Sequence, residues 1–524
     1  MPLSKHGRGA SWRLTRRDLL TSVAALTTAP LSVAMAGGTV SSLNDDDIMT
    51  WAKAMYALGA ADRYGYRMPG TASDHANANY IADELRKLGL VDVMLEPVPV
   101  AIAFPDRWSL ELHQDGKREA LPCSFLRYAG YTVPEGLTAE LVHVGDGKAA
   151  DFAAQDVRGK IVMVDIGLPG KAPRVGADYY VLDRDGTIPQ DEANFAWPPA
   201  NLAASYKLAV QHGAAGWIGI LDLFGDDTAE YHHWYAGYEL PAVTISARTG
   251  DRLRRSLSPG TKATITLTGT RGQGTSFNVY GTLPGRKRDG YVLVKSHHDG
   301  WATNEASGSA VTLAVAHLLS HQKATPLDRD VLFFFRASHF GVGWTIFPEE
   351  RNMSVADATR IYGLDPGWEK FSSKLRELLP QIVAANNIEM MGRQYRPAKP
   401  GSTGDGWVPT DLASIRYWGV TGPEGGANPV LLDTVRGAID RHDLDRSRIS
   451  NFLLGDGWDL TQHGIPLVNC ISHNIYQFTP KDTPETILRD KLLDMALAFA
   501  DIVRAQDAAG AAALRPATYV PFPH

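Results

Sequence analysis

The spacing of apolar and polar positions changes several times along this 524-residue chain. From residue 45 to residue 90 the apolar side chains recur at helical spacing, and Gly89 stands where a helix C-terminal cap is expected. Residues 91–100 then alternate as in a β-strand, until Pro97 and Pro99 interrupt them in the way typical of a sheet edge. The pattern therefore predicts helices followed by an edge strand.

Short apolar runs bounded by Gly and Pro fill residues 138–270. Runs of this length favour strands over long helices, so a β-rich inserted module is the simplest interpretation. The expected elements are strands at 140–144, 160–165 and 215–221, and a helix at 201–213.

After residue 270 strands and helices alternate, which predicts an α/β fold with a mostly parallel sheet covered by helices. The expected elements are a strand at 291–296, a helix at 307–321, and strands at 331–336 and 360–364. Ligands of such sheets bind at the carboxyl ends of the strands. Side chains able to bind a metal follow all three strands, namely His297, His298 and Asp299, then His339, then Asp365.

The first 36 residues have the order of a twin-arginine export signal. Arg16 and Arg17 precede an apolar stretch, and residues 34–36 form a small-x-small cleavage pattern. We therefore expect export to the periplasm or beyond. No other run approaches the roughly 20 apolar residues of a membrane span, so we expect none.

The composition argues against a nucleic-acid partner and against a metal site built from cysteines. The formal charge is -6, without the basic excess of a nucleic-acid-binding protein, so we expect no nucleic-acid partner. Cys123 and Cys470 are the only cysteines, too few for a thiolate metal site, so a metal must depend on the 16 His and the carboxylates. The sequence leaves open whether the two cysteines pair and whether the chain forms a homo-oligomer.

Several motifs follow one another in a recognisable order, at residues 67–71, 80–82, 88–90, 296–299, 302–308, 335–341, 464–466 and 479–483. In this order they resemble the di-zinc aminopeptidase family that includes glutamate carboxypeptidase and the transferrin receptor. Residues 157–162 and 212–216 make the insert similar to a protease-associated domain. The resemblance implies a three-layer α/β/α catalytic domain formed by residues 37–137 and 271–510, with the insert at 138–270 and a tail at 511–524.

The resemblance also implies roles for residues around the first strand of the α/β part. His297 matches the family's first zinc-binding His, and Asp299 matches the Asp that orients it. Asp365 matches the carboxylate of the first metal. The bridging Asp of the family falls on Asn304, and the Asn after it falls on Glu305.

The remaining family positions differ more strongly. The two consecutive glutamates, a general base and a zinc ligand, fall on Ser338 and His339. The closing His falls on Phe478, or on Gln477 if the register shifts by one.

These differences predict an altered, single-metal site. Neutral Asn304 cannot offset the repulsion of two cations, and Phe478 offers no donor. His297, His339 and Asp365 can still hold one divalent metal, zinc first, although iron(II) and manganese also suit these donors. Ser338 cannot act as the base, so we expect Glu305 to replace it, with His298 next.

Three functions follow from this site. The first is an exported metal-dependent hydrolase that cleaves a C-N bond of a small or peptide-like substrate. The second is a metal-dependent lyase or isomerase on the same fold, and the third is a non-catalytic binding protein. His473 could instead complete the metal set, whereas a metal pair at His232 and His233 is disfavoured because adjacent side chains of an extended segment point to opposite faces. Four aromatic residues could line a pocket or belong to the core, namely Trp301, Trp344, Trp368 and Tyr476.

Overall fold

The structure is a computed structural model that describes residues 43–515, except 115, 168–177, 189–199, 223–226, 233–238, 323–325, 340–341, 344–355, 357–358, 361–362, 366, 368–369, 372, 399–405, 423–425, 451–452 and 454. Several predictions fall outside the described residues, namely the export signal, the end of the predicted tail at 516–524, His233, Trp344 and Trp368.

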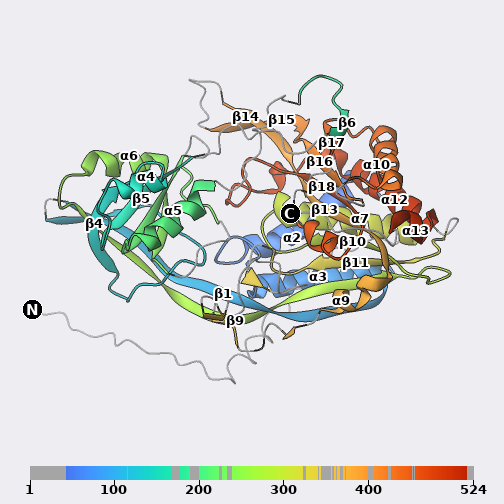
Figure 1. The fold of residues 1–524 in the computed structure, drawn as a ribbon, viewed down its shortest axis with the longest axis horizontal. Coiled ribbons are helices and arrows are strands. Elements are labelled where there is room, and N and C mark those ends of the chain that lie inside the picture. Colours follow the sequence, from blue (N-terminus) through green and yellow to red (C-terminus); the bar gives the residue numbers. More distant parts are fainter. Residues whose placement is uncertain are drawn as a thin grey trace, which may run out of the picture. The chain divides into compact units, whose positions relative to one another are not determined.

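Four parallel strands form the centre of the sheet (Figure 1). In spatial order they are β11 (Asp330–Arg336), β10 (Tyr291–His297), β13 (Ile382–Met391) and β18 (Leu467–Ser472). β11, β13 and β18 are buried along their whole length, as expected for parallel strands covered on both faces. The predicted α/β class with a mostly parallel sheet is confirmed.

Helices cover both faces of this sheet unequally. Val292 and Val294 of β10 pack into one core, while Leu293 between them packs into the other, because successive side chains of a strand point to opposite faces. The helices on the valine side are long, namely α2 (Asp45–Ala60), α3 (Ala72–Lys87), α7 (Gly308–His321), α10 (Pro429–Arg441) and α12 (Leu492–Ala508). Those on the leucine side are short, namely α9 (Lys374–Leu378) and α11 (Trp458–Thr461).

The helical pattern of residues 45–90 corresponds to α2 and α3. α3 ends at Lys87, and Gly89 adopts the left-handed φ of +81° that a C-terminal cap requires. None of the helices in the described part of the chain is long and apolar enough to cross a membrane.

Two long antiparallel strands run side by side along the described chain, β1 (Val91–Gln114) and β9 (Lys262–Leu283) (Figure 1). Over residues 91–99, β1 pairs with β9 alone among the described strands, so the predicted sheet edge is confirmed there. The strand nevertheless continues to Gln114, because a proline at an edge interrupts no second ladder.

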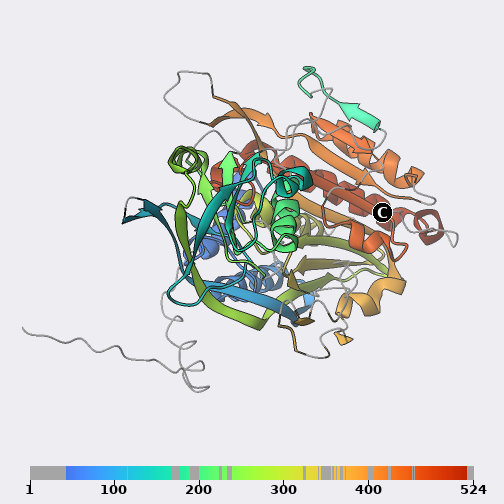
Figure 2. The same cartoon turned by 60° about the vertical axis from the view of Figure 1, so that its left-hand side comes forward.

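The predicted strands and helix of the insert lie within a few residues of their expected positions. They are β4 (Leu137–His143), β5 (Ile161–Gly167), β7 (Gly216–Asp222) and α5 (Ala200–Gln211), joined by β8 (Ala242–Ser246) and α6 (Ala247–Ser256). β9 pairs with β4 near one end and with β11 near the other, and the predicted boundary at residue 270 falls inside it. β6 (Asp178–Leu182) pairs antiparallel with β17 (Ser447–Ser450), although the two strands are far apart in the sequence (Figure 2).

One predicted strand is wrong. Residues 363–365 form no strand, and Gly363 has a φ of +66°, which is incompatible with a β-strand. The third parallel strand of the central group is β13 instead, and this shift changes which carboxylate lies at the sheet edge.

Candidate metal site

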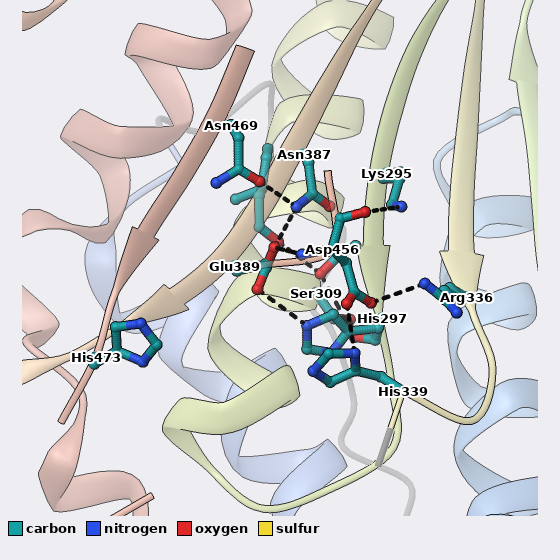
Figure 3. A network of polar contacts seen from close by, with 12 residues as sticks. Lys295, His297, Ser309, Arg336, His339, Asn387, Glu389, Asp456, Asn469 and His473 are labelled. Atoms are coloured by element: carbon teal, nitrogen blue, oxygen red, sulfur yellow. Dashed lines mark hydrogen bonds and ion pairs between the residues drawn. The ribbon is translucent and has the colours of Figure 1, made fainter. Parts of the chain in front are cut away.

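Four buried or nearly buried side chains converge where the central strands end (Figure 3). His297 is the last residue of β10, His339 follows β11, and Glu389 lies near the end of β13. Asp456 comes from the loop between β17 and α11. The rule that ligands of parallel sheets gather at the carboxyl ends of strands therefore identifies the correct edge.

His297, His339 and Asp456 form a triad whose donor atoms all lie within 4.8 Å of one another. The two imidazole rings are stacked, with centroids 4.2 Å apart and an interplanar angle of 19°. Nδ1 of His339 lies 2.7 Å from Oδ1 of Asp456. Burial lowers the pKa of His339 to about 3, against the opposing charge of Asp456, so this ring is neutral near pH 7. Two imidazoles and a carboxylate suit a divalent metal such as zinc.

Glu389 adds a second carboxylate beside the triad. Its Oε1 accepts hydrogen bonds from the backbone N–H of Asp456, at 2.7 Å, and from Nδ2 of Asn387. Its Oε2 lies 3.6 Å from Nε2 of His297. Burial raises the pKa of Glu389, and His297 opposes this shift. Gly455 has a φ of +84°, and a Cβ there would overlap the Glu389 carboxylate, so only glycine fits.

Two buried cations balance the carboxylates on this side of the sheet. Nζ of Lys295 lies 2.6 Å from Oδ2 of Asp459, and Nη1 of Arg336 lies 3.3 Å from the same oxygen. Arg336 also lies 3.2 Å from Oδ2 of Asp456. Burial would raise the pKa of Asp456, but His339 and Arg336 hold it well below its usual range, so Asp456 is ionised.

The structure corrects the assignment of Asp365. This residue is exposed, and its backbone N–H and carboxylate both bond to the side chain of Gln273, at 2.8 and 3.4 Å. It does not join the triad, because the strand that was expected to carry it is absent. Asn304 and Glu305 belong to a π-helical turn, η2 (Thr303–Ser307), before α7. Their side chains lie outside the described part, so their roles stay predictions.

Asp299 contacts the candidate metal site, whereas its neighbour His298 does not. Oδ1 of Asp299 accepts a hydrogen bond from the backbone N–H of His339, at 2.9 Å, and so positions the second imidazole. His298 turns away, since its Nε2 donates to the carbonyl of Phe277 at 2.9 Å and its Nδ1 lies 3.8 Å from Asp74. Burial lowers the pKa of His298 to about 4. The structure does not bring His298 into the cluster.

Phe478, on which the resemblance places the family's closing His unless the register shifts to Gln477, is an aromatic core residue. Phe478 is buried, has a φ of 68°, and packs edge-on against Tyr231 and Trp301. His473 stands to the side of the four converging residues, with Nδ1 2.7 Å from Oε1 of Gln477 (Figure 3). Trp301 and Tyr476 belong to a buried core cluster, which favours the packing interpretation of both.

Sequence reasoning missed Glu389 and Asp456. Glu389 follows the run 382–385, which is apolar but is then interrupted by two asparagines. A carboxylate shortly after such a run was the signal that could have found it. Asp456 lies between two glycines in a loop, and no spacing in the sequence connects it to the histidines.

Residues 278–338, from β9 to just after β11, match the model of peptidase family M28. The chain is similar in structure to BSAP, a zinc aminopeptidase from Bacillus subtilis, with 19% identity, a TM-score of 0.58, and coverage of 91% of this chain and 98% of that one. It is also similar to a peptidase M28 precursor from Shewanella amazonensis, with 17% identity, a TM-score of 0.58, and coverage of 92% and 100%.

An aminopeptidase from Aneurinibacillus sp. strain AM-1 is a third similar structure, with 20% identity, a TM-score of 0.50, and coverage of 92% and 98%. No curated protein sequence matches the chain. The matches extend over nearly the whole described part, insert included. The chain therefore has the fold of these aminopeptidases, and the segment that carries His297 is similar to peptidase family M28.

Proposed function

We propose that this protein is an exported metal-dependent hydrolase that cleaves an amide C-N bond in a small or peptide-like substrate. The observation that carries the proposal is the triad of His297, His339 and Asp456 at the carboxyl ends of the central strands. The fold of zinc aminopeptidases and the family M28 match around His297 support the same reaction class.

The donor set fits one divalent cation, with zinc favoured. All three residues offer nitrogen or oxygen atoms within 4.8 Å of one another, and the cluster is shielded from solvent. His297, His339 and Asp456 would hold the metal, with Asp299 fixing the backbone of His339. A metal bound there supplies Lewis-acid activation of a water and of the substrate carbonyl.

Glu389 is the side chain best placed to move the proton of the attacking water. Two N–H donors fix its Oε1, while Oε2 has no hydrogen-bond partner among the described residues and faces His297. A proton accepted at Oε2 can pass to the leaving amine. Losing a general base typically costs about 10² to 10⁴ in rate.

Metal analysis of purified variants tests the proposal. We expect about one equivalent of zinc in the wild type, and less than about 0.1 equivalent after His339→Ala or Asp456→Ala. Asp365→Ala is the matched control, because it removes an exposed carboxylate of the same chemistry and should keep the metal. Equal metal contents in all four proteins would refute the site.

Glu389→Gln separates a base from a ligand. If Glu389 is the base, its replacement by glutamine does not remove the metal. We therefore expect the Glu389→Gln variant to keep its full zinc content and to hydrolyse peptide anilides at a rate lowered about 10²-fold or more. Loss of the metal in Glu389→Gln would instead make Glu389 a ligand.

A further inference from the structure

A buried arginine outside the metal site has no counter-ion among the described residues. The side chain of Arg127 is fully buried, and no acidic residue among those described contacts it. Its Nη1 donates a long hydrogen bond of 3.4 Å to the hydroxyl of Tyr66. Its guanidinium carbon lies 5.8 Å from the ring centre of Tyr66 and 5.4 Å from that of Tyr128. Two cation–π contacts compensate only part of the cost of burying a guanidinium.

The unused atoms of Arg127 form one edge of the guanidinium. Nε and Nη2 have no hydrogen-bond partner among the described residues. The N–H groups of these two atoms point in parallel from the same edge, which is the fork that binds both oxygens of a carboxylate. An arginine whose packing contacts leave this edge unused is arranged for a bidentate anion.

The surroundings of Arg127 extend to the chain segment that follows His297. Tyr66 stacks on Trp301, with centroids 4.2 Å apart, and Trp301 lies shortly after His297 in the chain. His232 of the insert packs 5.1 Å from Tyr66, and its Nδ1 has no hydrogen-bond partner among the described residues. The acidic Glu230 contacts His232 and not Arg127. Aromatic rings and an imidazole therefore pack around the buried guanidinium of Arg127 and reach Trp301, in the segment that follows His297.

We propose that Arg127 binds a carboxylate group of the substrate, with His232 as a second polar contact and aromatic rings on either side. The site thus selects substrates that carry a free carboxylate near the amide bond, such as peptides with an unblocked C-terminus. The claim that Arg127 decides which substrates are cleaved rests on the proposed hydrolase function. The claim that Arg127 binds a carboxylate does not depend on hydrolysis.

Binding of two uncleavable probes tests the carboxylate contact. Calorimetry with 3-phenylpropanoate and with 3-phenylpropan-1-ol compares the same aromatic group with and without the charge. We expect the wild type to bind the carboxylate on the order of 10- to 100-fold more tightly, and Arg127→Gln to lose this preference. Arg127→Lys keeps the charge but not the fork, so it should lose most of the preference even if Arg127→Gln fails to fold.

Arg329→Gln is the matched control. It removes another buried guanidinium, which lies just before β11 and donates to backbone carbonyls at the C-terminal end of α12, away from the site. It should keep the wild-type preference. Equal binding of the two probes by the wild type, or a preference that persists in Arg127→Gln and Arg127→Lys, would overturn the proposal.

Hydrolysis then separates the two proposals. We expect alanyl-phenylalanine to be cleaved at least 10-fold more efficiently than its C-terminal amide by the wild type, and about equally by Arg127→Lys. If neither peptide is cleaved while the probes still differ in binding, the hydrolase proposal fails and the carboxylate site stands. Cleavage of both peptides at equal rates by the wild type refutes the carboxylate site alone.

Discussion

The buried ion pair between Lys295 and Asp459 should contribute strongly to stability. Both side chains are fully buried, and Nζ of Lys295 also donates to the carbonyl of Asp456 at 2.8 Å. Removing one partner of a buried pair costs about 3 to 5 kcal/mol, because the other charge stays buried. Asp459 keeps a contact with Arg336 at 3.3 Å, so we expect Lys295→Met to lower the free energy of unfolding by about 3 kcal/mol.

Urea titration of the unfolding transition measures this loss. Arg63→Met is the control, since the Arg63–Asp106 pair also joins a cation to an aspartate, at 3.3 Å, but its side chains are 51% and 62% exposed. An exposed pair contributes only about 0 to 1 kcal/mol. The double variant Lys295→Met/Asp459→Leu removes both charges and should be more stable than Lys295→Met alone.

Two results would refute this reasoning. A loss below about 1 kcal/mol in Lys295→Met, equal to that of Arg63→Met, would mean that the burial of the charges does not set their contribution. A double variant as destabilised as the sum of the single variants would mean that lost packing, and not an unpaired charge, causes the effect.

Three further predictions concern other parts of the chain. Gly455→Ala should lower the rate of peptide hydrolysis about 10- to 100-fold by displacing the Glu389 carboxylate while keeping the zinc, whereas Gly89→Ala, with a similar φ of +81° and open space, should leave the rate unchanged; equal rates would contradict the assigned contact. Burial lowers the pKa of His473 from 6.5 to about 4, so the unfolded state takes up the proton first, and stability falls as the pH drops through this window. Between pH 6.5 and 4 the wild type should therefore lose about 3 kcal/mol more of its unfolding free energy than His473→Gln, and parallel curves in urea titrations would exclude this effect. Replacing Arg16 and Arg17 by Lys should keep the protein in the cytoplasm, as fractionation would show, and unchanged export would argue against the twin-arginine signal.

The predictable part of the fold is the part whose signals are local. The spacing of Ile81 and Leu85 places them on the buried face of α3, and Gly89 marks its end. β13 escaped prediction because Asn386 and Asn387 interrupt its apolar run. Both are buried and bond to partners that are distant in the sequence, Gln506 for Asn386 and Asn469 for Asn387, in addition to the neighbouring Glu389, so their fit to a strand depends largely on tertiary contacts.

The residues of the candidate site also divide into those with a local sequence signal and those without one. His297 and His339 follow two strands with clear patterns, and the structure brings their rings together. Asp365 matches the family's first-metal carboxylate and was expected to follow a strand, but residues 363–365 form none, whereas Glu389 lies near the end of β13 and 3.6 Å from His297. Asp456 lies close to the histidines although it is far from them in the sequence, and no local spacing encodes this contact.

The continuity of β9 affects how the insert can be exchanged between proteins. A recombination that joins new sequence at residues 138 and 270 would cut this strand between its pairing with β4 and its pairing with β11. Each fragment would then expose unpaired backbone groups along β1. A chimera that keeps its ladders must transfer residues 91–283 together, so the exchangeable unit is larger than the module that the sequence pattern outlines.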